Sequence, residues 1–208
     1  MLPNGRTLLV EGRDDREVVY QFCNIHGVSN RDYFSVEAKD GYENLREDLS
    51  IRPKASDSIV GAIIDADEDL AVRWLSITGV LIDLGYDMPA VPPPNGLIID
   101  HTRFARVGLW VMPNNTTAGI LETFLALLVD NDDDLFPVAM RAVAEIPLGM
   151  QRFRDVDKAK AHIHTWLAWQ EQPGTSLGLA ITRRYLDANT PIAGTFLSWL
   201  RSLFQIPM

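Results

Sequence analysis

The feature that most constrains the fold of this chain is an uncharged run of small and β-branched residues at positions 58–64. A continuous run of this kind, too short for an ordinary helix, is typical of a central parallel strand that is buried on both faces. Acidic residues follow it at once, in the order Asp65-Ala66-Asp67-Glu68-Asp69. The sequence therefore predicts a parallel α/β sheet whose central strand ends in a group of carboxylates.

The rest of the first half alternates between short apolar runs and stretches with helical spacing. This alternation is typical of βαβ units, in which a helix connects neighbouring parallel strands. We expect further strands at 7–10, 33–36, 97–99 and 106–112, and helices at 14–26, 42–49, 70–84 and 120–129.

The part of the chain after residue 130 has a different character. Stretches with helical spacing follow one another there, separated by breaks that contain proline or glycine. They lie at 135–146, 157–170, 177–186 and 193–204. We therefore expect an α/β core at residues 1–130 and a helical C-terminal extension at residues 131–208 that packs on this core. Hydrophobic residues make up 47% of the 208 positions, which is enough to fill such a core.

The overall charge limits the kinds of partner that the chain can bind. The formal net charge is −9. Broad, sequence-independent binding of nucleic acid depends on Lys and Arg that neutralise phosphates, so this balance argues against it. The charge does not exclude an enzyme whose acidic residues hold metal ions, because bound cations reverse the local field.

Targeting signals are absent from the sequence pattern. The apolar run near the N-terminus is too short for a signal peptide, and no later stretch reaches membrane-spanning length. The single cysteine, Cys23, has no partner for an internal disulfide and lies among apolar residues of an expected helix, so we interpret it as a small core residue. We expect a cytoplasmic protein with no membrane segment.

Three carboxylates follow the ends of two predicted strands. Glu11 follows the first strand, and Asp65 and Asp67 follow the central one. In parallel sheets, ligands bind beyond the carboxyl ends of the strands. Hard cations such as Mg²⁺ prefer carboxylate oxygens, and a cation held there can bind phosphate oxygens. These residues therefore indicate a site for a metal ion or a phosphate group.

A structural interpretation of the same acids competes with the metal site. Acidic residues at the start of a helix cap it and interact well with its dipole. Asp69 is placed to cap the helix expected at 70–84. Asp14 and Asp15 could contribute to the site, but they begin the helix expected at 14–26, and we favour that role for them. For any one carboxylate, capping or solvation explains its position as well as metal binding does.

Four segments in this order carry a resemblance to a known family. LLVEGRDD, followed some fifty residues later by IIDADED, resembles the Toprim pattern of a Glu after the first strand and a DxD after the third. GLWVMPNNTTAGILETFL and KAHIHTWLAWQEQPGTSLG resemble an uncharacterised Toprim-like family. That family is related in its core to the nuclease domains of the overcoming-lysogenization-defect ATPases. The resemblance covers nearly the whole chain and implies a Toprim-like α/β fold.

The resemblance also implies roles for particular residues. Toprim proteins include topoisomerases, primases and nucleases that work with Mg²⁺. Glu11, Asp65 and Asp67 would be ligands of Mg²⁺ or Mn²⁺, and Glu11 would double as a general acid or base. Glu122 would serve a second cation, and Lys160 would stabilise negative charge that develops on phosphate.

One position departs from the family pattern. The turn after the strand at 106–112 reads Pro113-Asn114-Asn115, where the family pattern leads us to expect Pro-Asp-Asn. Asn114 keeps an oxygen ligand but lacks the negative charge. If this position binds metal, a second cation would be held weakly or not at all.

Three functions follow from these observations. The first is a Toprim-type nuclease, a metal-dependent phosphodiester hydrolase that acts on DNA or RNA, with an ATPase partner implied by the related nucleases. The second is a catalytically silent Toprim-like module with a regulatory or binding role, which the acidic total and Asn114 favour. The third is a phosphate-accepting domain or DxD phosphatase, in which Asp65 would be a nucleophile. The sequence does not specify the oligomeric state.

Overall fold

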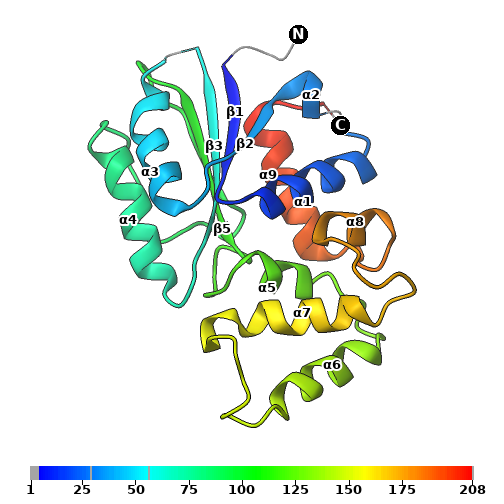
Figure 1. Cartoon of the computed structure of the whole chain (residues 1–208). Helices are drawn as coiled ribbons and strands as arrows, with labels where there is room; N and C mark the ends of the chain where they lie inside the picture. The colour runs from blue at the N-terminus through cyan, green and yellow to red at the C-terminus, as the bar shows by residue number, and fades with distance from the viewer. Residues whose placement is uncertain (1–4, 29, 56, 208) are drawn as a thin grey trace.

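The computed structural model describes residues 5–28, 30–55 and 57–207, and within them the chain forms one five-stranded sheet with helices on both faces (Figure 1). The sheet confirms the predicted α/β class. Its strands are β1 (Arg6–Val10), β2 (Ser35–Ala38), β3 (Ile59–Asp65), β4 (Leu97–Ile99) and β5 (Arg106–Met112).

The strand order places the uncharged run at the centre of the sheet. The order is β2-β1-β3-β5-β4, and every neighbouring pair is parallel except β4 and β5. β3 pairs with β1 on one side and β5 on the other, and its residues from Ile59 to Ile64 are all buried. Burial on both faces explains why this segment has no charged side chain before Asp65.

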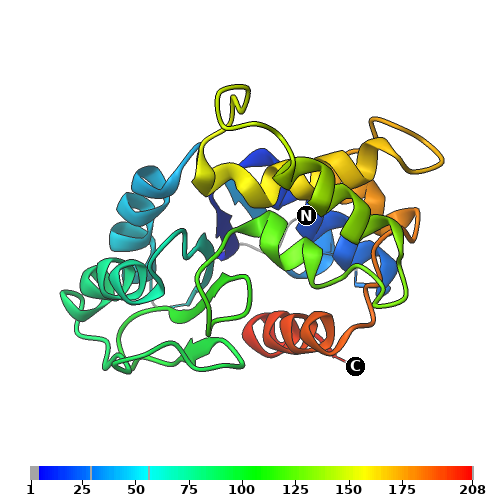
Figure 2. The ribbon, with the colours of Figure 1, turned by 90° about the horizontal axis from the view of Figure 1, so that it is seen from below.

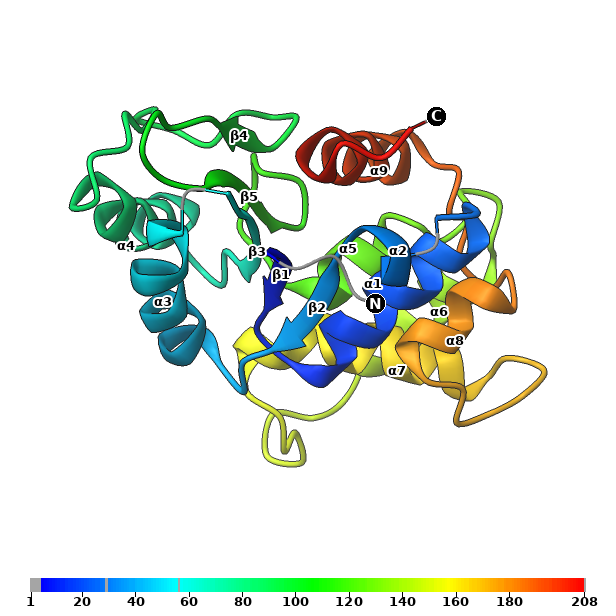
Figure 3. The same cartoon turned by 90° about the horizontal axis from the view of Figure 1, so that it is seen from above.

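Helices cover the two faces of the sheet unequally. α3 and α4 lie on one face, whereas α1 and α9 lie on the other (Figures 1 and 3). The N-terminal helices are α1 (Arg13–Ile25), α2 (Asn30–Tyr33), α3 (Tyr42–Ile51), α4 (Leu70–Ile82) and α5 (Leu121–Ala126). The C-terminal helices are α6 (Leu135–Ala144), α7 (Lys158–Ala168), α8 (Leu177–Thr182) and α9 (Pro191–Phe204), and 3₁₀ turns η1 (Arg52–Lys54) and η2 (Asp155–Asp157) precede β3 and α7.

One predicted strand is wrong in its position. The strand expected at 33–36 begins at Ser35, and residues 30–33 form the short helix α2. The apolar side chain of Phe34 suggested a strand residue, but it is fully buried and stacks on Phe204 of α9, with ring centroids 4.2 Å apart. Pairing with β1 starts at Thr7 opposite Ser35, so the register of β1 decides where β2 begins.

The C-terminal helices share a core with the first half of the chain. α9 packs on the sheet where two glycines allow close approach, since a Cβ at Gly61 or Gly108 would lie within 2.8 Å of the Leu203 side chain. Phe196 of α9 contacts Trp110 of β5 and Phe124 of α5 through ring centroids 5.1 and 5.5 Å apart. Residues on both sides of position 130 therefore belong to one hydrophobic cluster.

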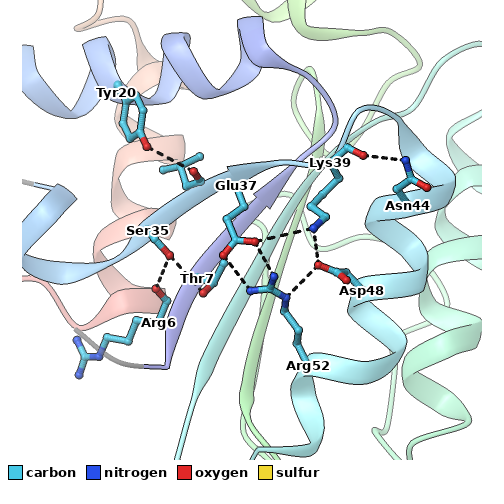
Figure 4. Close-up of polar contacts among 10 residues, drawn as sticks. Arg6, Thr7, Tyr20, Ser35, Glu37, Lys39, Asn44, Asp48 and Arg52 are labelled. Carbon is cyan, nitrogen blue, oxygen red and sulfur yellow. Dashed lines mark hydrogen bonds and ion pairs between the residues drawn. The ribbon is translucent and has the colours of Figure 1, made fainter. Parts of the chain in front are cut away.

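Charged side chains tie the β2 edge of the sheet to α3. Arg52 donates to both carboxylate oxygens of Glu37 on β2 and to Asp48 on α3, and Lys39 lies 2.7 Å from the Asp48 carboxylate (Figure 4). The arginine lies with its carboxylate partners at the surface, where each pair adds only about 0–1 kcal/mol to stability. Because both cations have partners in this network, this edge offers little free positive charge.

Two further expectations concern a membrane-spanning helix and the environment of Cys23. None of the helices in the described part of the chain is both long and apolar enough to span a membrane. Cys23 is a buried residue of α1, and burial raises the pKa of its thiol to about 12. The prediction that Cys23 is a core residue is confirmed.

Candidate functional site

The candidate site lies at the end of the sheet where the parallel strands finish. β1 and β3 are adjacent, with Val10 opposite Ile63, so the residues that follow them are neighbours in space. α5 and α7 cross this end of the molecule, and Figure 2 views them from that side. The topology therefore places Glu11, Asp65 and the first turn of α5 together.

Two of the predicted ligands are linked through the backbone. The Glu11 carboxylate accepts a hydrogen bond from the Asp65 amide at 2.8 Å. The Asp65 carboxylate accepts one from the Leu121 amide at the start of α5, at 3.0 Å. These two bonds join β1, β3 and α5, and they hold both carboxylates at the edge of the sheet.

Asp15 and Glu122 complete a cluster of four acids, the carboxylate cluster, with Glu11 and Asp65. Asp15 is 8% exposed and Glu122 is 6% exposed. Burial raises the pKa of Asp65 well above its ordinary value, and the charges of Asp15, Glu11 and Glu122 raise it further. The four side chains therefore lie close enough to repel one another.

The pKa values of the other three acids in the cluster are also raised by burial. Burial raises the pKa of Asp15 to about 6, and the neighbouring charge of Glu122 adds to the shift. Burial also raises the pKa of Glu11 and of Glu122. Carboxyl groups in such surroundings bind protons more readily than free carboxyl groups, and a cation at the same place would replace those protons.

A few cations border the cluster without neutralising it. Arg73 of α4 lies over the Tyr42 ring, 3.8 Å from its centroid, and acts to lower the pKa of Glu11. Lys160 and His164 of α7 act in the same way on the pKa of Glu122. Burial outweighs these cations, because the pKa of both carboxyl groups is still raised.

Asp67 is more exposed than the four acids of the carboxylate cluster. Its side chain is 52% exposed and forms an ion pair with Arg73. Its backbone has a positive φ of 52° and forms a two-bond bridge with Gly119. The two acids of the DxD pattern therefore have different partners, the Leu121 amide for Asp65 and Arg73 for Asp67.

Asn114 takes part in the turn that follows β5. Its side-chain oxygen accepts hydrogen bonds from the amides and hydroxyls of Thr116 and Thr117, at 2.9–3.0 Å. The neighbouring Asn115 is buried and accepts from the Val111 amide at 2.7 Å, so it holds the turn against the end of β5. Both asparagines have local structural partners.

Lys160 and His164 lie on one face of α7, and His162 lies on another. Lys160 is half exposed and lies 3.8 Å from Asp157. His164 is exposed on the side that faces Glu122, whereas His162 is partly buried and burial lowers its pKa. Lys160 and His164 are four residues apart and therefore share one face of the helix.

A metal ion could be held here by few protein ligands. No group of three or more His, Cys, Asp or Glu side chains in the described ranges is arranged to hold a metal ion. Mg²⁺ typically takes only one or two carboxylates and keeps several waters. Glu11 and Asp65 each use one oxygen for a backbone amide, and across the residues that the structure describes neither makes a second side-chain hydrogen bond. This donor pair fits Mg²⁺ or Mn²⁺ chemistry.

Two residues of the site were not singled out from the sequence. For Asp15 a role at the helix start was favoured over one at the site; it accepts a hydrogen bond from the Gly12 amide at 3.0 Å and also belongs to the cluster. Its place one helical turn after Glu11 was the available signal. Arg73 was not considered, although a single cation in the otherwise uncharged helix 70–82 marks it.

A family profile and two solved structures match the chain. The profile, described as a protein of unknown function (DUF3226), matches residues 5–205. No curated protein matches the chain at a significant level.

The two structures are of the C-terminal region of the OLD protein of Xanthomonas campestris pv. campestris, one phased with iodine and one with mercury. Each match covers 97% of this chain and 96% of that chain at 16% identity, with TM-scores of 0.47 and 0.48. Nothing about activity follows from a likeness of this size.

Proposed function

The chain belongs to the DUF3226 family, and we propose that it is a metal-dependent phosphodiester hydrolase of the Toprim type, acting on DNA or RNA. The observation that carries the proposal is the carboxylate cluster of Glu11, Asp15, Asp65 and Glu122. Burial raises the pKa of each of these groups, and the charges of other cluster members add to the shift for Glu11, Asp15 and Asp65. Buried charges of one sign persist when they hold a cation, and such sets mark functional sites.

Glu11 and Asp65 are the proposed ligands of Mg²⁺ or Mn²⁺. Each has one oxygen fixed by a backbone amide, which orients the carboxylate, and each has a second oxygen for a cation. A bound divalent cation supplies Lewis-acid activation of a phosphodiester and neutralises its charge. Asp15 and Glu122 would then hydrogen-bond to waters bound to the cation, because a Mg²⁺ ion keeps several waters in its coordination shell.

The remaining residues take roles that follow from their positions. Burial raises the pKa of Glu11, so it takes up a proton more readily than a free carboxyl group, which suits a general acid or base. Lys160 lies on the α7 face toward Glu122 and is half exposed, so its ammonium can meet an incoming phosphate. Asp67 and Asn114 are not among these proposed ligands, because Asp67 is exposed and paired with Arg73, and the Asn114 oxygen accepts hydrogen bonds from the turn hydroxyls.

Nucleic-acid affinity needs a source beyond this chain's own charge. The net charge is −9, and Lys39 and Arg52 are already paired at the β2 edge. Phosphate contacts from a few cations give weak, salt-sensitive binding. A partner, an ATPase by analogy with the nucleases that the sequence resembles, would supply the remaining affinity.

The test compares metal binding and cleavage in matched variants. Calorimetry with Mg²⁺ and with Mn²⁺ is run on the wild type, on Asp65→Ala and on Asp87→Ala, which removes an exposed acid outside the site. We expect the wild type and Asp87→Ala to bind the cation, and Asp65→Ala not to bind it. Cleavage of single-stranded and duplex DNA and RNA should fall by about 100-fold in the same variant. Wild-type cleavage in Asp65→Ala would refute the proposal.

A second candidate function is a catalytically silent binding module. It is supported by the lack of any three-ligand metal group in the described part of the chain. This candidate predicts a folded protein that binds neither cation in calorimetry and cleaves no nucleic acid, alone or with a partner. The same titration therefore separates the two functions.

A further inference from the structure

A pocket with a volume of 520 Å³ opens beside the carboxylate cluster. Its walls come from the loop after β3, the loop before α5, and the η2–α7 segment. The Asp67 and Gly119 backbones join the first two loops through hydrogen bonds of 3.0 and 2.8 Å. This volume lies in the range of roughly 300–1,000 Å³ that is usual for small-molecule sites.

The pocket and the candidate metal site are built on the same segments of the chain. Ile120 and Thr123 line it, and between them Leu121 donates its amide to Asp65 and Glu122 belongs to the cluster. On the other side, Ala159 lines the pocket and is the neighbour of Lys160 in α7. The segments that line the pocket therefore also carry Glu122 and Lys160, and the start of α5 binds Asp65.

The lining selects the kind of group that can enter. Ala118, Ile120, Val156 and Ala159 give aliphatic walls that suit a flat apolar ring. Glu68 and Asp155 place carboxylates on the wall, and Asp67 is already paired with Arg73.

Arg154, the cation among the described lining residues, is not placed to bind a phosphate inside the pocket. The guanidinium of Arg154 is held by Asp157 at 2.9 Å and is 79% exposed, so it lies at the mouth. A phosphate inside would meet an excess of negative charge, whereas a ring with amino hydrogens would meet acceptors.

We propose that this pocket receives one nucleobase of the nucleic-acid substrate, with preference for a base that carries an exocyclic amino group, and that the attached phosphate lies at the carboxylate cluster. Carboxylates accept hydrogen bonds from amino groups such as that of cytosine, which thymine lacks. A base in such a pocket has left its helical stack, so the substrate is single-stranded or locally unpaired. The inference rests on the proposed function for its choice of substrate.

The experiment measures binding of mononucleotides apart from cleavage. Calorimetry with 5′-dCMP and 5′-dTMP in the presence of Mg²⁺ is run on the wild type, on Ala159→Trp, which fills the pocket, and on Ala168→Trp, an exposed position of the same helix. Thermal unfolding followed by circular dichroism checks that each variant is folded. We expect tighter binding of dCMP than of dTMP, and a loss of about tenfold or more in Ala159→Trp only.

A second variant tests the base preference directly. Glu68→Gln combined with Asp155→Asn replaces two acceptors by amides, which both donate and accept, so dCMP and dTMP should then bind about equally. Unchanged preference in this variant, or wild-type dCMP binding in Ala159→Trp, overturns the proposal. So does wild-type protein that binds neither nucleotide.

Cleavage assays distinguish this failure from failure of the proposed function. Cleavage that is lost in Asp65→Ala but persists in Ala159→Trp at the wild-type rate, on single strands and duplexes alike, leaves the hydrolase in place and overturns the base pocket. Binding of dCMP that is lost in Ala159→Trp, in a protein that cleaves nothing, supports the pocket and refutes the hydrolase.

Discussion

Replacing Asp15 by Asn tests whether the carboxylate cluster stores electrostatic repulsion. Asp15 is 8% exposed, and burial, with the charges of its neighbours, raises its pKa from 3.8 to about 6. At about 1.36 kcal/mol per pKa unit, the ionised side chain costs the fold roughly 3 kcal/mol. Because the folded pKa is above the unfolded one, the cost is absent below pH 3.8, where the group is protonated in both states. Stability is lost as the pH rises from 3.8 through about 6, and the full cost is present above that pH.

The substitution removes the charge and keeps the local hydrogen bond. An Asn at position 15 still offers an oxygen to the Gly12 amide, which the aspartate accepts at 3.0 Å. It loses the favourable interaction of an acid with the start of α1, a cost of about 0.3–1 kcal/mol. Removal of the buried charge outweighs this cost, so the variant should be more stable than the wild type above pH 7, by about 2–3 kcal/mol.

The assay is urea unfolding of wild type and Asp15→Asn at several pH values from 4 to 8, with EDTA present. The difference in unfolding free energy should be near zero at pH 4 and should grow through pH 6. Asp14→Asn, at an exposed position in the same helical turn, is the control for loss of an N-terminal charge. A difference that does not depend on pH, or a variant less stable than wild type at pH 8, would contradict the reasoning.

Two further predictions concern the frame that positions the site. Asp69 caps α4 by accepting from the amides of Ala71 and Val72 at 2.9 and 3.0 Å, so Asp69→Ala should lower the free energy of unfolding by about 1 kcal/mol; equal stability in urea would show that this cap is dispensable. Gly61→Ala places a Cβ 2.7 Å from the Leu8 side chain and 2.8 Å from Leu203, and should cost about 1–3 kcal/mol. The control Gly79→Ala meets nothing within 4 Å in mid-helix and should gain about 0.5–1 kcal/mol, so a melting temperature that fell equally in both would refute the packing argument.

Local patterns were enough to predict most of the fold. The run at 58–64 predicted a buried central strand, and β3 confirms it with burial from Ile59 to Ile64. The stop of the strand at Asp65 and the cap at Asp69 also followed from local chemistry, because charge leaves the core and short acids cap helices. The resemblance to an uncharacterised family is confirmed by the family match over residues 5–205.

The site was predictable only in part. Glu11 and Asp65 were predicted together because parallel strands finish at the same edge of a sheet. Asp15 lies in the cluster as well as at the helix start; its spacing from Glu11 allows the first role, but only the fold brings it near Asp65 and Glu122. Asp67 was expected to share a cation with Asp65, and this stays a prediction; its backbone φ is 52° and Arg73 pairs with its exposed side chain, which no local pattern indicated.

The sequence by itself determined the class of fold, the central strand and the acids at its end, because these depend on burial and charge within a few residues of one another. The tertiary structure decided which of those acids meet. Four carboxylates from β1, α1, β3 and α5 share one buried place only because the strand order puts β1 beside β3 and the Asp65 carboxylate binds the start of α5. Contacts of this kind join residues more than 50 positions apart, and no local periodicity carries them.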